Sequence, residues 1–201
     1  MDFSDIYQRM KFEAYEISEN ERTQLTNYLK SAQSISSPKS HAGLLVFCYS
    51  SEPTSENIEL VRKFLAKNVD DYTRSAAVTG LYRIWKLGRA ADIDDLLSFL
   101  ALSLQESRHD TSVSAIGCSF LLMQRLKERR LSTALMKLLE TLHEEVRREN
   151  NFAVNLFTYA CWSAYDNWAQ SNGQRRIHFD MIEEALPIYW DRQKYLLEPI
   201  N

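Results

Sequence analysis

The stretch Asp71-Tyr72-Thr73-Arg74-Ser75-Ala76-Ala77 decides the fold, because the chain half-repeats it. The pattern returns 39 residues later as Asp110-Thr111-Ser112-Val113-Ser114-Ala115-Ile116, and more faintly as Glu149-Asn150-Asn151-Phe152-Ala153-Val154-Asn155. Each copy opens a predicted helix with an acidic residue and then places small residues where a neighbouring helix must come close. A period of roughly 40 residues is typical of stacked helix pairs. We therefore expect an architecture that offers a surface to a partner rather than one that holds a reaction centre.

The composition agrees with a helical, globular chain. Of 201 residues, 45% are hydrophobic and 25% are charged, which is ordinary for a soluble domain. Only 5 glycines and 4 prolines punctuate the sequence, and this scarcity disfavours an all-β design, which needs frequent turns. The length suits one domain with a substantial core. We expect a single α-helical repeat domain over residues 1–201.

Charge and cysteine usage restrict the partners and the compartment. The net charge of −3 argues against non-specific binding to nucleic acid or to an anionic membrane, because both are held mainly by basic residues. Three separated cysteines (Cys48, Cys118 and Cys161) without CxxC spacing indicate buried free thiols in a reducing compartment. The segment 1–20 is acidic and polar, so we expect no signal peptide there, and no apolar run is long enough to span a bilayer. We expect a soluble, cytoplasmic protein.

Capping residues and apolar spacing predict the helices. Ser18 and Glu21 form a capping box for a helix over 18–32, and a second apolar helix covers 41–50. From there the pattern predicts three antiparallel hairpins at 55–87, 92–128 and 132–171. Residues 1–54 and 172–201 would be the N-terminal and C-terminal cap regions, for about nine or ten helices in all. Gly88 is expected to end the helix that starts at residue 71, while Asp110 and Ser132 are expected to cap the later helices.

Two further features of the predicted helices concern packing. The helix that Ser132 opens carries an apolar stripe at helical spacing, which consists of Leu135, Leu138, Leu139 and Leu142. Gly80 and Gly117 lie within predicted helices, where glycine costs about 1 kcal/mol relative to alanine. We therefore expect another helix to cross closely at each glycine.

The segment DYTRSAAVTGLYRIWKLG (71–88) resembles the second helix of a HEAT repeat, in which an acidic turn residue precedes an arginine and paired alanines. Here those positions are Asp71, Arg74, Ala76 and Ala77. The resemblance covers about residues 55–171 and implies a HEAT/ARM-like α-α superhelix of stacked helix hairpins. The second copy departs from it, because Val113 stands where the arginine would recur. The resemblance concerns architecture and assigns no function.

The predicted helix over 151–171 is rich in aromatic residues and holds one charged residue, Asp166. Because consecutive residues turn by about 100°, the aromatics surround this helix, as in a helix packed between neighbours. Alternatively, one side reaches a concave surface and anchors a partner, since Trp and Tyr are enriched in interface hot spots. A small-molecule pocket is a third interpretation. The candidate partner-binding residues of this segment are Trp162, Tyr165, Asp166 and Trp168.

Two charge clusters lie at predicted helix ends. One is basic (Arg125, Lys127, Arg129 and Arg130) and the other is acidic (Asp92, Asp94 and Asp95). The helix dipole favours cations at C-termini and anions at N-termini, which is explanation enough for both. If the acidic cluster is functional, it would steer a partner of opposite charge. We therefore name Asp92, Asp94 and Asp95 as further candidate partner-binding residues, for a basic, nucleic-acid-cleaving partner.

No motif for catalysis, metal or cofactor binding stands out. The four histidines (His41, His109, His143 and His178) sit in separate elements without ligand spacing, and no nucleophile or phosphate-loop motif occurs. His143-Glu144 resembles one His-Glu pair of the iron-binding HEAT-type hydroxylases, which need several. HEAT-like DNA glycosylases are the most specific enzymatic alternative. They use Trp, Asp and Arg side chains on a concave basic surface, and Trp162, Asp166 and Arg175 would take those roles here. The predicted helix that carries Trp162 and Asp166 supplies no Lys or Arg for the basic face that duplex DNA needs. We expect no catalytic residue, no metal and no cofactor.

The function that this pattern favours is a non-enzymatic protein-binding module. It would act by occlusion, as a small stand-alone inhibitor of a basic toxin or enzyme. A bacterial toxin-neutralising (immunity) protein is one concrete version, suggested by analogy with HEAT-type stacks. The alternative is a structural or adaptor subunit of a larger assembly, whose isolated chain would expose apolar ends and self-associate.

Overall fold

The computed structural model describes residues 1–31, 37, 39–103, 109–147, 156 and 159–160. These residues form helices and turns, and no strand occurs among them, so the all-α prediction is confirmed. The chain divides by its packing into two compact units, Met1–Leu87 (unit 1) and Gly88–Asn201 (unit 2). Apart from Leu156, Tyr159 and Ala160, the helix predicted over 151–171 lies outside the described residues, as does the predicted C-terminal cap region.

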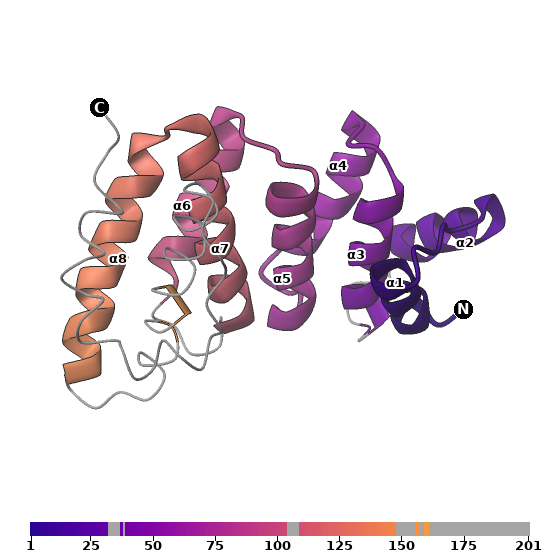
Figure 1. Cartoon of the computed structure of the whole chain (residues 1–201), viewed down its shortest axis with the longest axis horizontal. Helices are drawn as coiled ribbons and strands as arrows, with labels where there is room; N and C mark the ends of the chain where they lie inside the picture. The colour runs from indigo at the N-terminus through magenta and orange to yellow at the C-terminus, as the bar shows by residue number, and fades with distance from the viewer. Residues whose placement is uncertain (32–36, 38, 104–108, 148–155, 157–158, 161–201) are drawn as a thin grey trace. The chain divides into compact units, whose positions relative to one another are not determined.

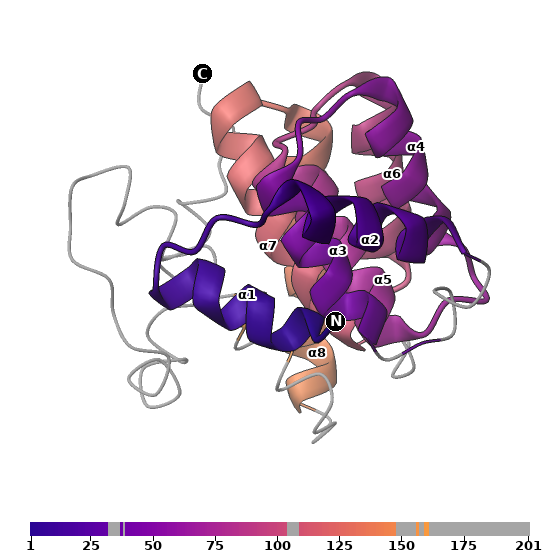
Figure 2. The same cartoon turned by 90° about the vertical axis from the view of Figure 1, so that its right-hand side faces the viewer.

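Unit 1 is built around one buried helix. In chain order, its elements are α1 (Phe3–Phe12), α2 (Glu19–Lys30), α3 (Lys39–Ser50), α4 (Ser55–Arg62), the 3-10 turn η2 (Lys63–Leu65), α5 (Asp71–Val78) and the π-helix η3 (Thr79–Ile84). Figure 1 shows α3 beside α5, and Figure 2 shows α1 and α2 on its other sides; α3 contacts all three and η3. Because neighbours surround it, α3 is apolar on every face and buries the whole run Ala42–Cys48.

The predicted capping box at the start of α2 is confirmed. The Ser18 hydroxyl accepts from the Glu21 N–H, and the Glu21 carboxylate accepts from the Ser18 N–H at 2.9 Å. The Tyr15 hydroxyl also donates to the same carboxylate. Hydrogen bonds from Ser18 and Tyr15 stabilise the anion, so the pKa of Glu21 lies below its ordinary value. The entry into α2 is therefore held by a carboxylate that is fully engaged.

Arg74 is the polar centre of the turn before α5. Its side chain is buried, and its guanidinium donates to the carbonyls of Ala66 (2.9 Å), Lys67 (3.1 Å) and Val69 (2.6 Å). The Asp71 carboxylate lies 4.0 Å from Nη1. A buried guanidinium is tolerated only when its donors and its charge are matched in this way. The acidic residue and the arginine of the repeat thus act as an internal clamp on one turn.

The helix that starts at Asp71 ends differently from the prediction. It continues as a π-helix to Ile84, and the left-handed residue that ends it is Lys86 (φ 55°), so the prediction that Gly88 closes it was wrong. The reason lies at Gly80. A Cβ there would stand 2.5 Å from the Cys48 sulfur, so the backbone of η3 packs directly on α3. This confirms the close approach predicted for Gly80.

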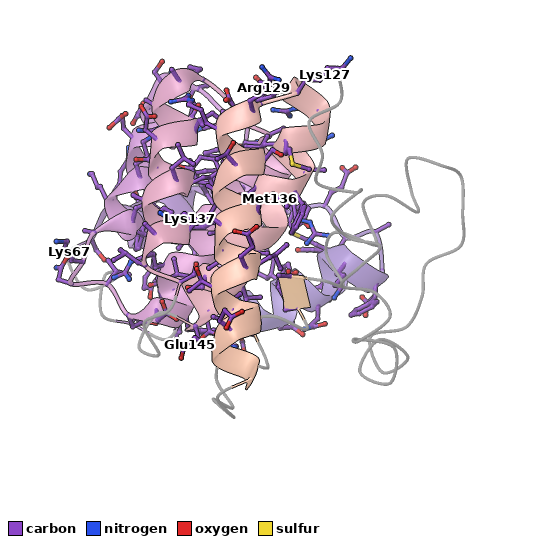
Figure 3. All side chains as sticks on the ribbon, turned by 90° about the vertical axis from the view of Figure 1, so that its left-hand side faces the viewer. Lys67, Lys127, Arg129, Met136, Lys137 and Glu145 are labelled. Carbon is purple, nitrogen blue, oxygen red and sulfur yellow. The ribbon has the colours of Figure 1, made fainter. Side chains whose placement is uncertain are left out.

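Unit 2 contains α6 (Ala90–Ala101), α7 (His109–Leu126) and α8 (Arg129–Arg147), and each of them contacts the other two. The predicted leucines of α8 (Leu135, Leu138, Leu139 and Leu142) are all buried. Figure 3 labels Arg129, Met136, Lys137 and Glu145 along this helix, of which Arg129 and Lys137 are exposed. The amphipathic stripe of α8 therefore faces the core of unit 2.

Three predicted caps are shifted. Helix α8 starts before Ser132, which is buried, and Glu128 accepts from the Arg130 N–H at 3.0 Å instead. Helix α7 starts at His109, so Asp110 lies in its first turn rather than at the cap. Helix α5 is capped by Asp70, whose carboxylate accepts from the Thr73 N–H at 2.8 Å. At α5 two adjacent acidic residues, Asp70 and Asp71, are available, and the first of them caps the helix.

Candidate partner-binding site

A pocket of about 590 Å³ opens in unit 1 at the C-terminal end of α3. Its walls come from α2, from the end of α3, from the loop that follows it and from α4. A volume of this size lies within the range of ligand-binding pockets, about 300–1,000 Å³. The lining residues are Arg22, Thr26, Phe47, Tyr49, Ser50, Ser51, Glu52 and Asn57.

One indole fixes the wall formed by α3 and the loop. The Trp85 Nε1–H donates to the carbonyls of Cys48 (2.8 Å) and Ser51 (3.0 Å), and its ring meets Phe47 edge-on at 6.0 Å between centroids. The last carbonyls of a helix have no partner inside the helix, so this donor supplies what α3 lacks at its end. The π-helix before Trp85 carries the ring to this place. The pocket wall is therefore preorganised by an element distant in sequence.

Three polar side chains of the lining donate their protons to backbone carbonyls. The Thr26 hydroxyl donates to the Arg22 carbonyl (2.9 Å), and the Ser50 hydroxyl donates to the Val46 carbonyl (2.8 Å). The Asn57 side-chain N–H donates to the Glu52 carbonyl at 2.8 Å. Because these protons are used, the oxygens of Thr26, Ser50 and Asn57 remain as acceptors. The lining thus presents acceptor oxygens together with one cation, Arg22.

Arg22 and Tyr49 are the two side chains of this lining with the chemistry of an interface anchor. Arg22 is half-buried, and its Nε is buried without a hydrogen-bond acceptor among the described residues. Tyr49 is 58% exposed although it directly follows the buried run Ala42–Cys48, and its ring lies 6.3 Å from that of Tyr7. Arg and Tyr are enriched among residues that dominate binding energy at interfaces. Together they give this end of unit 1 a small, mixed aromatic and cationic surface.

The predicted acidic cluster of unit 2 does not form one exposed surface. Asp92 is fully buried, and its carboxylate accepts from the Arg89 N–H at 2.7 Å at the start of α6. Asp94 is exposed, but it pairs with Arg130 at 2.8 Å, and Asp95 is half-buried. Hydrogen bonds from Arg130 to Glu128 and to Asp94 raise the pKa of this guanidinium. The acidic and basic clusters therefore meet within unit 2, through Asp94 and Arg130.

The other predicted partner-binding residues, Trp162, Tyr165, Asp166 and Trp168, lie outside the described residues, so their role stays a prediction. Sequence reasoning missed the pocket. Arg22 follows the capping-box glutamate and looks like any charge on a helix surface, while Tyr49 continues an apolar run that reads as core. A signal was present in the polar run Ser50-Ser51-Glu52, which leaves Tyr49 at the boundary of that core.

The two cysteines in the described region, Cys48 and Cys118, are buried in the packed core. Burial raises the pKa of the Cys48 thiol, because the thiolate would lose its hydration, and this makes Cys48 a poor nucleophile. Cys118 is buried as well, which confirms the prediction for both thiols. Over the described ranges, no group of three His, Cys, Asp or Glu side chains could hold a metal ion. No helix within those ranges is long and apolar enough to cross a membrane.

No protein-family model matches the chain, and neither a curated protein nor a solved structure matches it.

Proposed function

We propose that this protein is a non-enzymatic protein-binding module that uses the Arg22–Tyr49 end of unit 1 as its contact surface. The observation that carries the proposal is the 58% exposure of Tyr49 on the rim of a pocket that also contains Arg22. The Tyr49 ring lies 6.3 Å from the Tyr7 ring, but this neighbour leaves more than half of Tyr49 exposed to solvent. A partner that covers it would gain buried apolar area and a desolvated cationic contact.

The mechanism that fits this surface is occlusion of one partner. In its concrete version, the protein neutralises a toxin or another enzyme in the cytoplasm, as an immunity protein does, and its helices form a stack of hairpins that holds the contact surface rigid. Trp85 supports this view, since it fixes the loop wall through two carbonyls before any partner arrives. Preorganisation of this kind reduces the entropy cost of association.

The alternative is a structural or adaptor subunit of a larger assembly. One observation favours it, because Leu102 (36%) and Leu126 (42%) are exposed in unit 2. Scattered exposed leucines are normal on a monomer, so this observation carries less weight than the pocket. An adaptor would self-associate at micromolar concentration, whereas an inhibitor would remain a monomer. Light scattering on the purified chain separates the two.

The proposal is tested by affinity capture from the native lysate with three baits. The wild-type chain is compared with Tyr49→Ala and with Phe12→Ala, the latter removing an exposed aromatic (71%) that does not line the pocket. We expect one stoichiometric partner that binds the wild type and Phe12→Ala and is lost with Tyr49→Ala. One equivalent of the chain should inhibit that partner. A partner retained equally by all three baits would contradict the proposal.

A further inference from the structure

The charge of Arg22 is not balanced by the described part of unit 1. Its guanidinium makes no hydrogen bond or ion pair with the residues that the structure describes, although Nε is buried. Leaving a buried donor unsatisfied costs about 1–3 kcal/mol, and more for a charged group. Arg74, in the same unit, donates to three carbonyls. This contrast singles out Arg22 as a cation whose partner is not part of the described structure.

Neither the adjacent Glu21 nor Glu52, the acidic residue of the pocket lining, supplies that partner. The Glu21 carboxylate already accepts hydrogen bonds from the Ser18 N–H, the Ser18 hydroxyl and the Tyr15 hydroxyl. Glu52 lines the same pocket but makes no ion pair with Arg22, and its side chain lies at the exposed rim. The pocket therefore has a cation that lacks a counter-charge and an acidic rim that does not provide one.

We propose that the pocket takes the carboxylate of an Asp or Glu side chain presented by a protein partner, with Arg22 as the residue that binds it. The inference rests on the proposed function and names the chemistry of its contact. A carboxylate matches the planar guanidinium through two parallel N–H donors. Because Nε is buried, the donors that reach the partner here are those of the terminal Nη1 and Nη2. The carboxylate supplies the counter-charge that Arg22 lacks among the described residues.

The surroundings favour a side chain on a macromolecule over a free metabolite. Small-molecule sites enclose their ligands and are mostly apolar, whereas this lining is mostly polar and its rim residues, Tyr49 and Glu52, are exposed. A protein that carries the carboxylate would close the opening itself and cover the Tyr49 ring. The acceptor oxygens of Thr26 and Ser50 suit the backbone N–H donors that flank an acidic residue in a peptide.

The test is a titration of the full chain followed by NMR at the Arg22 Nε–H resonance. The probes are the blocked peptides acetyl-Gly-Glu-Gly-amide and acetyl-Gly-Gln-Gly-amide, which differ only in the carboxylate. We expect saturable binding of the Glu peptide in the millimolar range and a large shift of the Nε–H signal, with no saturable shift for the Gln peptide. Arg22→Gln should weaken the Glu peptide by at least about tenfold.

A second variant keeps the test independent of any folding defect in Arg22→Gln. Glu52→Gln removes a like charge from the rim and should tighten the Glu peptide by about two- to fivefold. Glu59→Gln is the matched control, because Glu59 is an exposed carboxylate that does not line the pocket, and it should change nothing. Equal shifts with both peptides, no saturable shift with either, or saturation by inorganic phosphate but not by the Glu peptide would each overturn the inference.

This readout needs no natural partner, so its failure is distinguishable from failure of the proposed function. If a partner binds in a Tyr49-dependent way but the Glu peptide does not bind, the protein-binding function stands and the proposal that the pocket binds a carboxylate is refuted. Conversely, peptide binding at Arg22 without a Tyr49-dependent partner would retain the carboxylate site and refute the function.

Discussion

The two clear copies of the repeat lie in different units, and they agree in packing but differ in polar chemistry. Thr73 in unit 1 and Ser112 in unit 2, 39 residues apart, are both buried. One position further along, Arg74 is buried and holds three carbonyls, while Val113 is half-buried and has no donor to offer. The repeat therefore preserves the small residues that let helices approach. It does not preserve the clamp.

The largest effect that separates the copies is expected at these two positions. Arg74→Met should lower the free energy of unfolding by about 3–5 kcal/mol, because it leaves the carbonyls of Ala66, Lys67 and Val69 without their donor. Val113→Ala should cost about 1 kcal/mol, since it removes methyl groups from a half-buried site. Urea unfolding of both variants measures the difference. Equal losses would mean that Arg74 is not a clamp.

A smaller difference in the free energy of unfolding is expected between alanine substitutions at the two helical glycines, Gly80 and Gly117. Gly80→Ala would place its Cβ 2.5 Å from the sulfur of Cys48, a short side chain held in the core, while Gly117→Ala would meet the far end of the Tyr159 side chain at 2.9 Å. We expect Gly80→Ala to cost about 1–3 kcal/mol through overpacking. Gly117→Ala should be within about 1 kcal/mol of neutral, since alanine is the better helix former.

A double-mutant cycle checks the cause at Gly80. Adding Cys48→Ala should recover part of the loss, because it removes the sulfur that the new methyl group meets. Thermal unfolding of the four chains provides the coupling energy. Strictly additive effects would place the cost of Gly80→Ala elsewhere, in the π-helix itself.

The smallest effect is a pH dependence at the start of α2. The pKa of Glu21 is lowered from 4.5 in the folded chain by hydrogen bonds from Ser18 and Tyr15, so the unfolded chain binds more protons near that pH. The contribution of Glu21 to stability is therefore complete above its unfolded pKa and is lost as the pH falls through the lower folded pKa. Glu21→Gln should flatten this acid limb of the stability curve between about pH 3 and 5. If the loss of stability at acid pH were the same in Glu21→Gln, the hydrogen-bonded Glu21 carboxylate would not be its source.

Sequence patterns predicted the features that depend on neighbours along the chain. The capping box of Ser18 and Glu21, the leucine stripe of α8 and the close approach at Gly80 all rest on local spacing, and the structure confirms each. The end of the helix at Lys86 was missed, because it depends on how Trp85 reaches carbonyls that precede it by 34 and 37 residues. Local rules do not register such a contact.

The candidate site escaped prediction for a related reason. Arg22 becomes notable only when its lack of a partner is seen, and that requires knowing which carboxylates are engaged elsewhere. The acidic cluster of Asp92, Asp94 and Asp95 looked accessible in the sequence, yet one member is buried and another is paired with Arg130. Whether charges at a helix end form a surface is decided by the neighbouring helix, which the sequence does not identify.

The central claim is that unit 1, rather than the acidic cluster of unit 2, carries the partner contact. The most direct measurement is the affinity of the captured partner for three chains: the wild type, Arg22→Gln in unit 1 and Asp94→Asn in unit 2. Each variant removes one charge. Our account predicts that Arg22→Gln weakens binding by at least about tenfold and that Asp94→Asn leaves it unchanged. Loss of binding with Asp94→Asn and full binding with Arg22→Gln would contradict it.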